Sequence, residues 1–193
     1  MIFVTSDFHF NHNKEFVYKK RGFETVEDMN EAIINAVNSV VMYHDDLYIL
    51  GDLMLGDNDK GLECLKRIKC NNLHIVYGNH DTDTRKALYQ TLPQNIVEAG
   101  HALVLKYNKF HYYFSHYPTL TSNVSKESLY QMTLNIHGHT HQDEVFLDKD
   151  KYPFMFHAGV DSAVDLKPWS LDEIGVLLTM NYHIYYGKKE ENE

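Results

Sequence analysis

The chain has 193 residues, of which 44% are hydrophobic and 23% charged, so it suits one globular domain with a large core rather than a disordered protein. Its formal net charge of −9 argues against long nucleic acids as partners, because most of the surface repels phosphate. No apolar run is long enough to predict a membrane span, and the apolar start lacks a basic leader. With Cys64 and Cys70 interpreted as reduced thiols, we expect a cytoplasmic protein.

No linker, repeat or low-complexity segment divides the chain. We therefore expect residues 1–188 to form a single domain and residues 189–193 to be a frayed acidic tail. The sequence leaves the oligomeric state open.

The first half of the chain alternates strands and helices. Short apolar runs predict buried strands at Ile2–Ser6, Leu47–Leu50 and Leu73–Tyr77. Apolar residues at helical spacing predict helices at Glu27–His44, Asp59–Lys69 and Thr84–Tyr89, with Thr25 as the N-cap of the first.

The second half is richer in strands. Strands are predicted at Ala102–Tyr107, Phe110–Ser115, Thr133–His137 and Phe154–Ala158, followed by a closing hairpin of Gly175–Met180 and Tyr182–Tyr186. Strand–helix alternation followed by hairpins favours an α/β fold of two packed mixed β-sheets flanked by helices.

Five of the predicted strands are each followed by side chains of the types that bind metals. The residues are Asp7 and His9 in SDFH, Asp52 in GD, Asn79, His80 and Asp81 in GNHD, His116 in SHYP, and His139 and His141 in GHTH. Ligands bind at the carboxyl ends of strands in α/β folds. Imidazole, carboxylate and amide donors together suit divalent manganese, iron, zinc, nickel or cobalt.

These motifs, in this order, resemble the calcineurin-like metallophosphoesterase superfamily, and the segment HAGVD…KPWSLDEI is similar to its small bacterial and phage members. The resemblance implies a four-layer α-β-β-α sandwich with two divalent metal ions, manganese first among the candidates. It also implies the ligands of each ion. One ion would be held by Asp7, His9 and His141, the other by Asn79, His116 and His139, with Asp52 bridging both.

The residues give physical support to that assignment. In an extended Asp7-Phe8-His9 stretch, both polar side chains point the same way. Gly51, Gly78 and Gly138 precede ligands, and glycine lets the backbone turn sharply or approach closely. Asn79 binds through a neutral oxygen, which leaves positive charge at the metals for a phosphate anion.

The resemblance gives His80 and Asp81 catalytic roles. His80 would face the phosphate and assist the leaving oxygen, and Asp81 would orient the His80 ring. The implied reaction is in-line attack on phosphorus by a hydroxide that bridges the metals.

Three further residues are candidates for substrate contact or for support of the ligands. They are His12 at the rim of the site, Arg85 as a phosphate-binding cation and His157 behind the ligands. The alternatives are a solvated loop for His12, a solvated helix face for Arg85 and a position without contact to the ligands for His157.

Departures from the family pattern bear on the substrate. Protein phosphatases continue the GD motif with an arginine, whereas here the stretch reads GDLMLGD. We expect a small anionic phosphoester, namely a phosphodiester or nucleotide derivative. The alternatives are a phosphomonoesterase that uses Arg85, Lys86 or Lys126, and a catalytically weak metal-binding scaffold.

Overall fold

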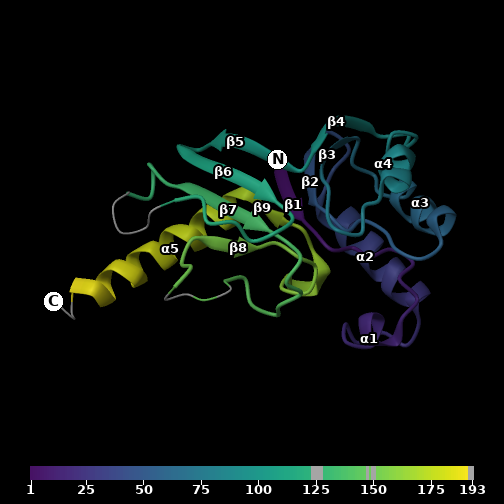
Figure 1. Cartoon of the computed structure of the whole chain (residues 1–193), viewed down its shortest axis with the longest axis horizontal. Helices are drawn as coiled ribbons and strands as arrows, with labels where there is room; N and C mark the ends of the chain where they lie inside the picture. The colour runs from purple at the N-terminus through teal and green to yellow at the C-terminus, as the bar shows by residue number, and fades with distance from the viewer. Residues whose placement is uncertain (123–127, 147, 149–150, 191–193) are drawn as a thin grey trace.

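The computed structural model describes residues 1–122, 128–146, 148 and 151–190. The chain folds into two mixed β-sheets flanked by helices, which confirms the predicted α/β class (Figure 1). The elements are β1 (Ile2–Thr5), α1 (Glu15–Tyr18), α2 (Val26–Val40), β2 (Asp46–Leu50), α3 (Asn58–Lys66), β3 (Asn72–Val76), α4 (Asp83–Tyr89), β4 (Asn95–Gly100), β5 (Ala102–Tyr107), β6 (Phe110–Ser115), β7 (Thr133–His137), β8 (Met155–His157), a 3₁₀ turn (Val164–Leu166), β9 (Trp169–Ser170) and α5 (Leu171–Glu190).

The first sheet has the strand order β4-β3-β2-β1-β9. Strands β1 to β4 are parallel, and β9 pairs antiparallel with β1. Parallel strands need crossover connections, which α2 and α3 supply between β1, β2 and β3. The carboxyl ends of β1, β2 and β3 therefore lie at one edge of this sheet.

The second sheet has the order β5-β6-β7-β8, with β5 antiparallel to β6 and the other pairs parallel. An isolated bridge between Ser6 and Gly159 links the segments that leave β1 and β8. Because β6, β7 and β8 run the same way, their carboxyl ends also share an edge. The bridge brings that edge to the one formed by β1 to β3.

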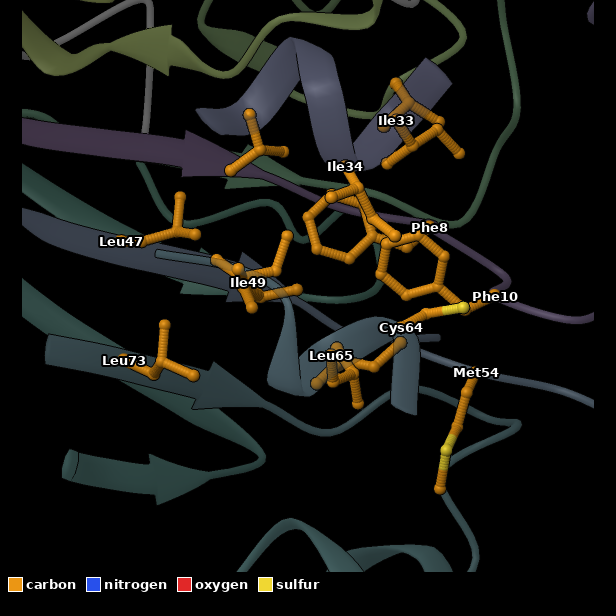
Figure 2. Packing of buried hydrophobic residues seen from close by; sticks show 14 of the residues in the cluster. Phe8, Phe10, Ile33, Ile34, Leu47, Ile49, Met54, Cys64, Leu65 and Leu73 are labelled. Atoms are coloured by element: carbon orange, nitrogen blue, oxygen red, sulfur yellow. The ribbon is translucent and has the colours of Figure 1, made fainter. Parts of the chain in front are cut away.

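One hydrophobic core fills the space between the first sheet and the helices α2 and α3. Figure 2 shows the rings of Phe8 and Phe10 beside Ile33 of α2 and Leu65 of α3. Both rings are fully buried and lie 5.0 Å apart between centroids. Since Phe8 and Phe10 alternate with Asp7 and His9, their burial fixes the segment that carries two predicted ligands.

A second core lies between the two sheets and includes one face of α5. Val4 and Leu50 of the first sheet meet Phe114 and Ile136 of the second. Leu178 of α5 belongs to the same cluster. The two sheets are thus packed together by apolar side chains directly beneath their shared carboxyl edge.

The predicted closing hairpin is wrong, because Gly175–Met180 and Tyr182–Tyr186 both lie within helix α5. The helix begins with a capping box: Ser170 Oγ accepts from the N–H of Glu173, and the Glu173 carboxylate accepts from the N–H of Ser170. Its buried residues recur at helical spacing: Leu171, Ile174, Leu178 and Asn181. The β-branched and tyrosine residues of this segment have a preference for strands, but burial of one face against the second core favours the helix.

Other differences are smaller. The strands β4 and β9 and the short helix α1 are not among the predicted elements, and α2 ends at Val40 rather than at His44. The predicted N-cap is present, since Thr25 accepts a hydrogen bond from the N–H of Asp28. Residues 189 and 190 of the expected tail belong to α5, and residues 191–193 lie outside the described residues.

Cys64 and Cys70 are buried free thiols. None of the helices in the described ranges is long and apolar enough to cross a membrane.

Candidate metal centre

The structure brings the predicted metal ligands together at the shared edge of the two sheets. They come from the segments after β1 (Asp7, His9), β2 (Asp52), β3 (Asn79), β6 (His116) and β7 (His139, His141). The donor atoms of Asp7, His9 and His141 lie within 4.8 Å of one another, as do those of Asp7, Asp52 and His116. Side chains distant in sequence therefore form one compact cluster of donors.

The first donor set consists of Asp7, His9 and His141. His9 Nε2 lies 3.1 Å from His141 Nε2, and His141 Nε2 lies 3.8 Å from Asp7 Oδ1. Asp7 Oδ1 is buried and has no hydrogen-bond partner among the described residues. A buried oxygen without a donor is costly unless a cation occupies the space before it, which fits a metal ion.

The second donor set consists of Asn79, His116 and His139. Asn79 Oδ1 lies 2.9 Å from both His116 Nε2 and His139 Nδ1, and these two nitrogens are 3.2 Å apart. His116 Nδ1 donates to the carbonyl of Leu50 at 2.8 Å, which leaves Nε2 as the nitrogen with a free lone pair. Three acceptor atoms thus converge, as they do around a bound cation.

Asp52 lies between the two sets. Its Oδ2 atom is 3.6 Å from His9 Nε2 and 3.4 Å from His116 Nε2. Burial opposes ionisation of this carboxyl, but the hydrogen bond and charge of His116 lower the pKa of Asp52 to about 2. Burial likewise opposes the charged form of His116, yet Asp52 and Asp7 raise the pKa of its imidazole. The same carboxylate therefore interacts with both donor sets.

The backbone of the ligand segments adopts left-handed conformations. The φ angles are 59° at Asp7, 51° at His9, 54° at Asp52, 69° at His139 and 47° at His141. The expectation of an extended Asp7-Phe8-His9 stretch is therefore wrong, although polar and apolar side chains still alternate along it. Left-handed residues turn the chain after β1, β2 and β7, which aims the ligands of these segments at the same space.

Two glycines allow the ligand segments to approach closely. Gly51 has a φ of 92°, and a Cβ there would lie 2.5 Å from His116 Nδ1. A Cβ on Gly78 would collide with the carboxylate of Asp52. The segments after β2 and β3 thus fit together only because neither residue carries a side chain.

Asp81 makes different contacts from those expected for a residue that orients His80. Its carboxylate accepts from the N–H groups of Gly78 at 2.7 Å, Asp52 at 2.8 Å and Leu53 at 3.3 Å, and from the hydroxyl of Tyr89 at 2.6 Å. These four donors use both oxygens, so Asp81 fixes the backbone that carries Asp52 instead of orienting the His80 ring. This is a correction to the predicted role.

His80 lies at the edge of the donor cluster. Its side chain is 41% exposed, and its Nε2 atom is 4.0 Å from Asp52 Oδ2. Its backbone N–H donates to Asp52 Oδ1 at 2.9 Å, which ties the turn to the central carboxylate. The imidazole therefore faces the solvent side of the cluster, where a substrate has to enter.

Sequence reasoning missed two residues that support the ligands. Asp161 Oδ2 lies 2.7 Å from His141 Nδ1, and both Asp161 oxygens bind the guanidinium of Arg21 at 2.8 and 3.0 Å. Arg21 also donates to the carbonyls of Asp7 and Phe8. Burial opposes ionisation of Asp161, yet hydrogen bonds from His141 and Arg21 hold its pKa well below the usual range. The segment HAGVD contains Asp161, but only the fold reveals its partner.

His12 lies beside the first donor set. Its ring is 5.3 Å from that of His9 between centroids, and burial together with nearby cationic groups lowers its pKa to about 4. The predicted rim position of His12 agrees with this location.

His157 is fully buried behind the ligands, and its Nδ1 lies 2.9 Å from Ser162 Oγ. Gly159 separates His157 from Asp7: a Cβ on Gly159 would lie 2.7 Å from His157 Nε2 and 3.2 Å from Asp7 Oδ2. His157 therefore packs behind a ligand without being one.

Arg85 turns away from the donor cluster. Its guanidinium donates to the carbonyl of His80 at 2.5 Å and to Asn58 Oδ1 at 2.9 Å. It also lines a separate cavity of about 510 Å³ together with Lys14 and Lys60. Its contacts hold the turn that presents His80.

Comparison with known proteins identifies the class. A model of the calcineurin-like phosphoesterase superfamily domain matches residues 1–158, so the chain belongs to this superfamily. This result confirms the resemblance noted from the motifs and makes the cluster at the sheet edges the expected metal-binding region of a phosphoesterase.

Particular relatives come from archaea, phage and bacteria. The chain is 31% identical over 188 residues to the uncharacterized protein MJ1445 of Methanocaldococcus jannaschii, covering 92% of this chain and 90% of that one. It is 26% identical over 178 residues to the Gene 66 protein of Mycobacterium phage L5, covering 82% and 85% of the two chains. The crystal structure of AQ665 from Aquifex aeolicus, a protein of unknown function, is similar with a TM-score of 0.69 and 25% identity over 92% of this chain and 98% of that one.

Proposed function

We propose that this protein is a phosphodiesterase that depends on a pair of divalent metal ions, with manganese the expected metal, and that it hydrolyses small phosphodiesters such as nucleotide derivatives. The position of Asp52 carries this proposal. One of its oxygens lies within 3.6 Å of a donor from each of two imidazole-containing sets. A carboxylate shared in this way is the expected bridge of a dinuclear site.

The donor chemistry fits a pair of divalent ions. Asp7, His9 and His141 would hold one ion, and Asn79, His116 and His139 the other, with Asp52 shared. Imidazole nitrogens with carboxylate and amide oxygens suit manganese and its first-row neighbours. When bound, the ions supply a hydroxide nucleophile at neutral pH and positive charge for the phosphoryl oxygens.

The chain's own residues account for the departure of the alcohol. Hydrolysis forms a bond between a water oxygen and phosphorus and breaks the bond from phosphorus to the leaving alcohol, whose oxygen takes up a proton. His80 supplies this proton, because its partly exposed ring lies at the entrance of the cluster, 4.0 Å from Asp52. Asn79 binds through a neutral oxygen, so the site keeps more positive charge for the substrate than an aspartate would leave.

The arginines near the site and Lys86 are engaged by other groups, which favours a monoanionic diester over a dianionic monoester. Arg85 is bound to the His80 carbonyl and Asn58, and Arg21 is bound to Asp161. Lys86 lies beside Asp83 and over the ring of Tyr77. Lys126, another candidate cation, lies outside the described residues.

The test compares hydrolysis of bis-p-nitrophenyl phosphate with that of p-nitrophenyl phosphate by the manganese-loaded protein. We expect the diester to have the higher kcat/KM and Asp52→Ala to abolish its hydrolysis. A preference for the monoester would instead identify a phosphomonoesterase. Inactivity on both, together with metal analysis showing no bound ions, would leave a scaffold and overturn the proposal.

A further inference from the structure

A cavity of about 330 Å³ opens directly beside the donor cluster. His9, His141 and His80 form its inner end, and Phe16, Val17 and Lys20 form the outer part. The outer residues come from α1 and the turn that follows it. The volume lies within the range of small-molecule sites.

We infer that this cavity is the subsite for the leaving side of the substrate and that it takes a flat aromatic substituent, of the nucleobase or aryl type. The inference rests on the proposed function, which it extends by assigning one half of the diester to a place on the protein.

The location follows from His80. A proton donor has to lie within hydrogen-bond reach of the oxygen that departs. His80 lines this cavity. It is 4.0 Å from the Asp52 oxygen shared by the two donor sets. A phosphoryl group bound by the ions that Asp52 would share would therefore have its leaving oxygen on the side of His80, and the carbon substituent on that oxygen would extend into the cavity.

The aromatic preference follows from the rings along the wall. The Phe16 ring lies edge-to-face with His12, with centroids 5.8 Å apart and an interplanar angle of 87°. His12 is 5.3 Å from His9, and His9 is 5.4 Å from His80 between centroids. Phe16 is 73% exposed, so its face is available to a ligand. A continuous row of rings of this kind suits stacking and edge contacts with another ring.

The charged groups along the cavity are either paired with each other or offer hydrogen-bond donors to a ligand. Arg21 and Asp161 also line it, but they are paired with each other and only 3% and 5% exposed. Lys20 donates to the carbonyl of His141 at 2.9 Å, and an ammonium group has further N–H donors. These donors suit the carbonyl or ring-nitrogen acceptors at the edge of a nucleobase.

The experiment measures binding of phenylphosphonate and methylphosphonate to the manganese-loaded protein by calorimetry. Both ligands carry the same charged group, and neither has a phosphoester bond to hydrolyse. From the usual strength of ring stacking we expect phenylphosphonate to bind about tenfold more tightly than methylphosphonate. Phe16→Ala should remove most of this advantage, and Phe16→Trp should restore it.

The matched control is Tyr43→Ala, which removes another exposed aromatic ring outside the residues that line the cavity. It should keep the full advantage of the phenyl ligand. Equal affinities for the two phosphonates in the wild-type protein, or an undiminished advantage in Phe16→Ala, would overturn the subsite. If bis-p-nitrophenyl phosphate is still hydrolysed in that case, only the subsite fails. If the protein neither hydrolyses this diester nor binds either phosphonate, the proposed function fails with it.

Discussion

Asp161 accepts a hydrogen bond from Nδ1 of His141 over 2.7 Å, on the side of the ring opposite to the donor cluster. This contact fixes the tautomer of His141, so that Nε2 presents its lone pair toward Asp7 and His9. Arg21 holds Asp161 in place through both carboxylate oxygens.

Asp161→Asn should therefore weaken manganese binding. The amide can donate to Nδ1 and so favour the wrong tautomer, and loss of such a supporting contact typically costs about 10- to 100-fold in metal affinity. Calorimetric titration with Mn²⁺ measures the effect. Asp165→Asn, at a side chain that is 73% exposed, is the control and should bind the metal normally. Unchanged affinity in Asp161→Asn would refute a positioning role.

Tyr89→Phe should destabilise the fold. The Tyr89 hydroxyl donates to Asp81 at 2.6 Å, inside the network that holds the backbone of Asp52. A hydrogen bond to a charged group contributes about 1.5–3 kcal/mol, and urea denaturation should show a loss of this size in the free energy of unfolding. Tyr43→Phe, at an exposed ring, should change stability by less than about 0.5 kcal/mol.

Gly78→Ala should impair metal binding with little loss of secondary structure. The added methyl group would collide with the Asp52 carboxylate and displace it from its position between the donor sets. We expect manganese affinity to fall by about tenfold or more, as for other displaced ligands. Gly187→Ala is the matched control because nothing lies within 4 Å of a Cβ there. Normal metal content in Gly78→Ala would contradict the close packing of the two segments.

His80→Ala should retain the metals and lose turnover. His80 is 41% exposed and its Nε2 atom lies 4.0 Å from Asp52 Oδ2, at the edge of the donor cluster, and general acid catalysis contributes about 10²- to 10⁴-fold. Metal analysis and kcat on bis-p-nitrophenyl phosphate separate the two effects. Loss of bound manganese in this variant would show that His80 is a ligand rather than a proton donor.

Manganese should stabilise the folded protein, and more strongly as the pH rises. Binding to the folded state alone adds about 2.7 kcal/mol at a free metal concentration of 100 times Kd. Burial raises the pKa of the Asp7 carboxyl above its ordinary value of 3.8, so the metal-free protein loses stability as the pH rises above 3.8 through this raised pKa. Manganese binds the ionised carboxylate and restores that stability. Thermal melts with manganese or a chelator between pH 4 and 8 test this, and a Tm increment independent of pH would contradict it.

The convergence of the candidate ligands could be predicted from the sequence, because their positions depend on a general rule. Parallel strands place their carboxyl ends at one edge, so Asp7, Asp52 and Asn79 meet without further information. The pairing of Arg21 with Asp161 depends on how the turn after α1 packs against the segment after β8. No local sequence pattern predicts that packing. The predicted role of Asp81 differs from the observed one for a similar reason: its neighbour in sequence is His80, but its partners come from the segments after β2 and β3 and from α4.

Helix α5 shows that local strand and helix propensities do not always predict the secondary structure. Its capping box at Ser170 and Glu173 was readable, yet the tyrosines and β-branched residues that follow suggested strands. Tertiary contacts of Leu171, Ile174 and Leu178 with the second core outweighed those local preferences.

The left-handed backbone at Asp7, His9, Asp52, His139 and His141 restricts how this centre can change. Aspartate, asparagine and histidine tolerate that conformation better than other residues with side chains, and they are also donor residues that suit the proposed ions. The backbone conformation and the metal-binding chemistry thus favour the same few residue types. Redesign toward another ion should succeed by exchanging these residue types for one another. Glutamate or cysteine at these positions would instead add the conformational cost of a left-handed backbone to the free energy of metal binding.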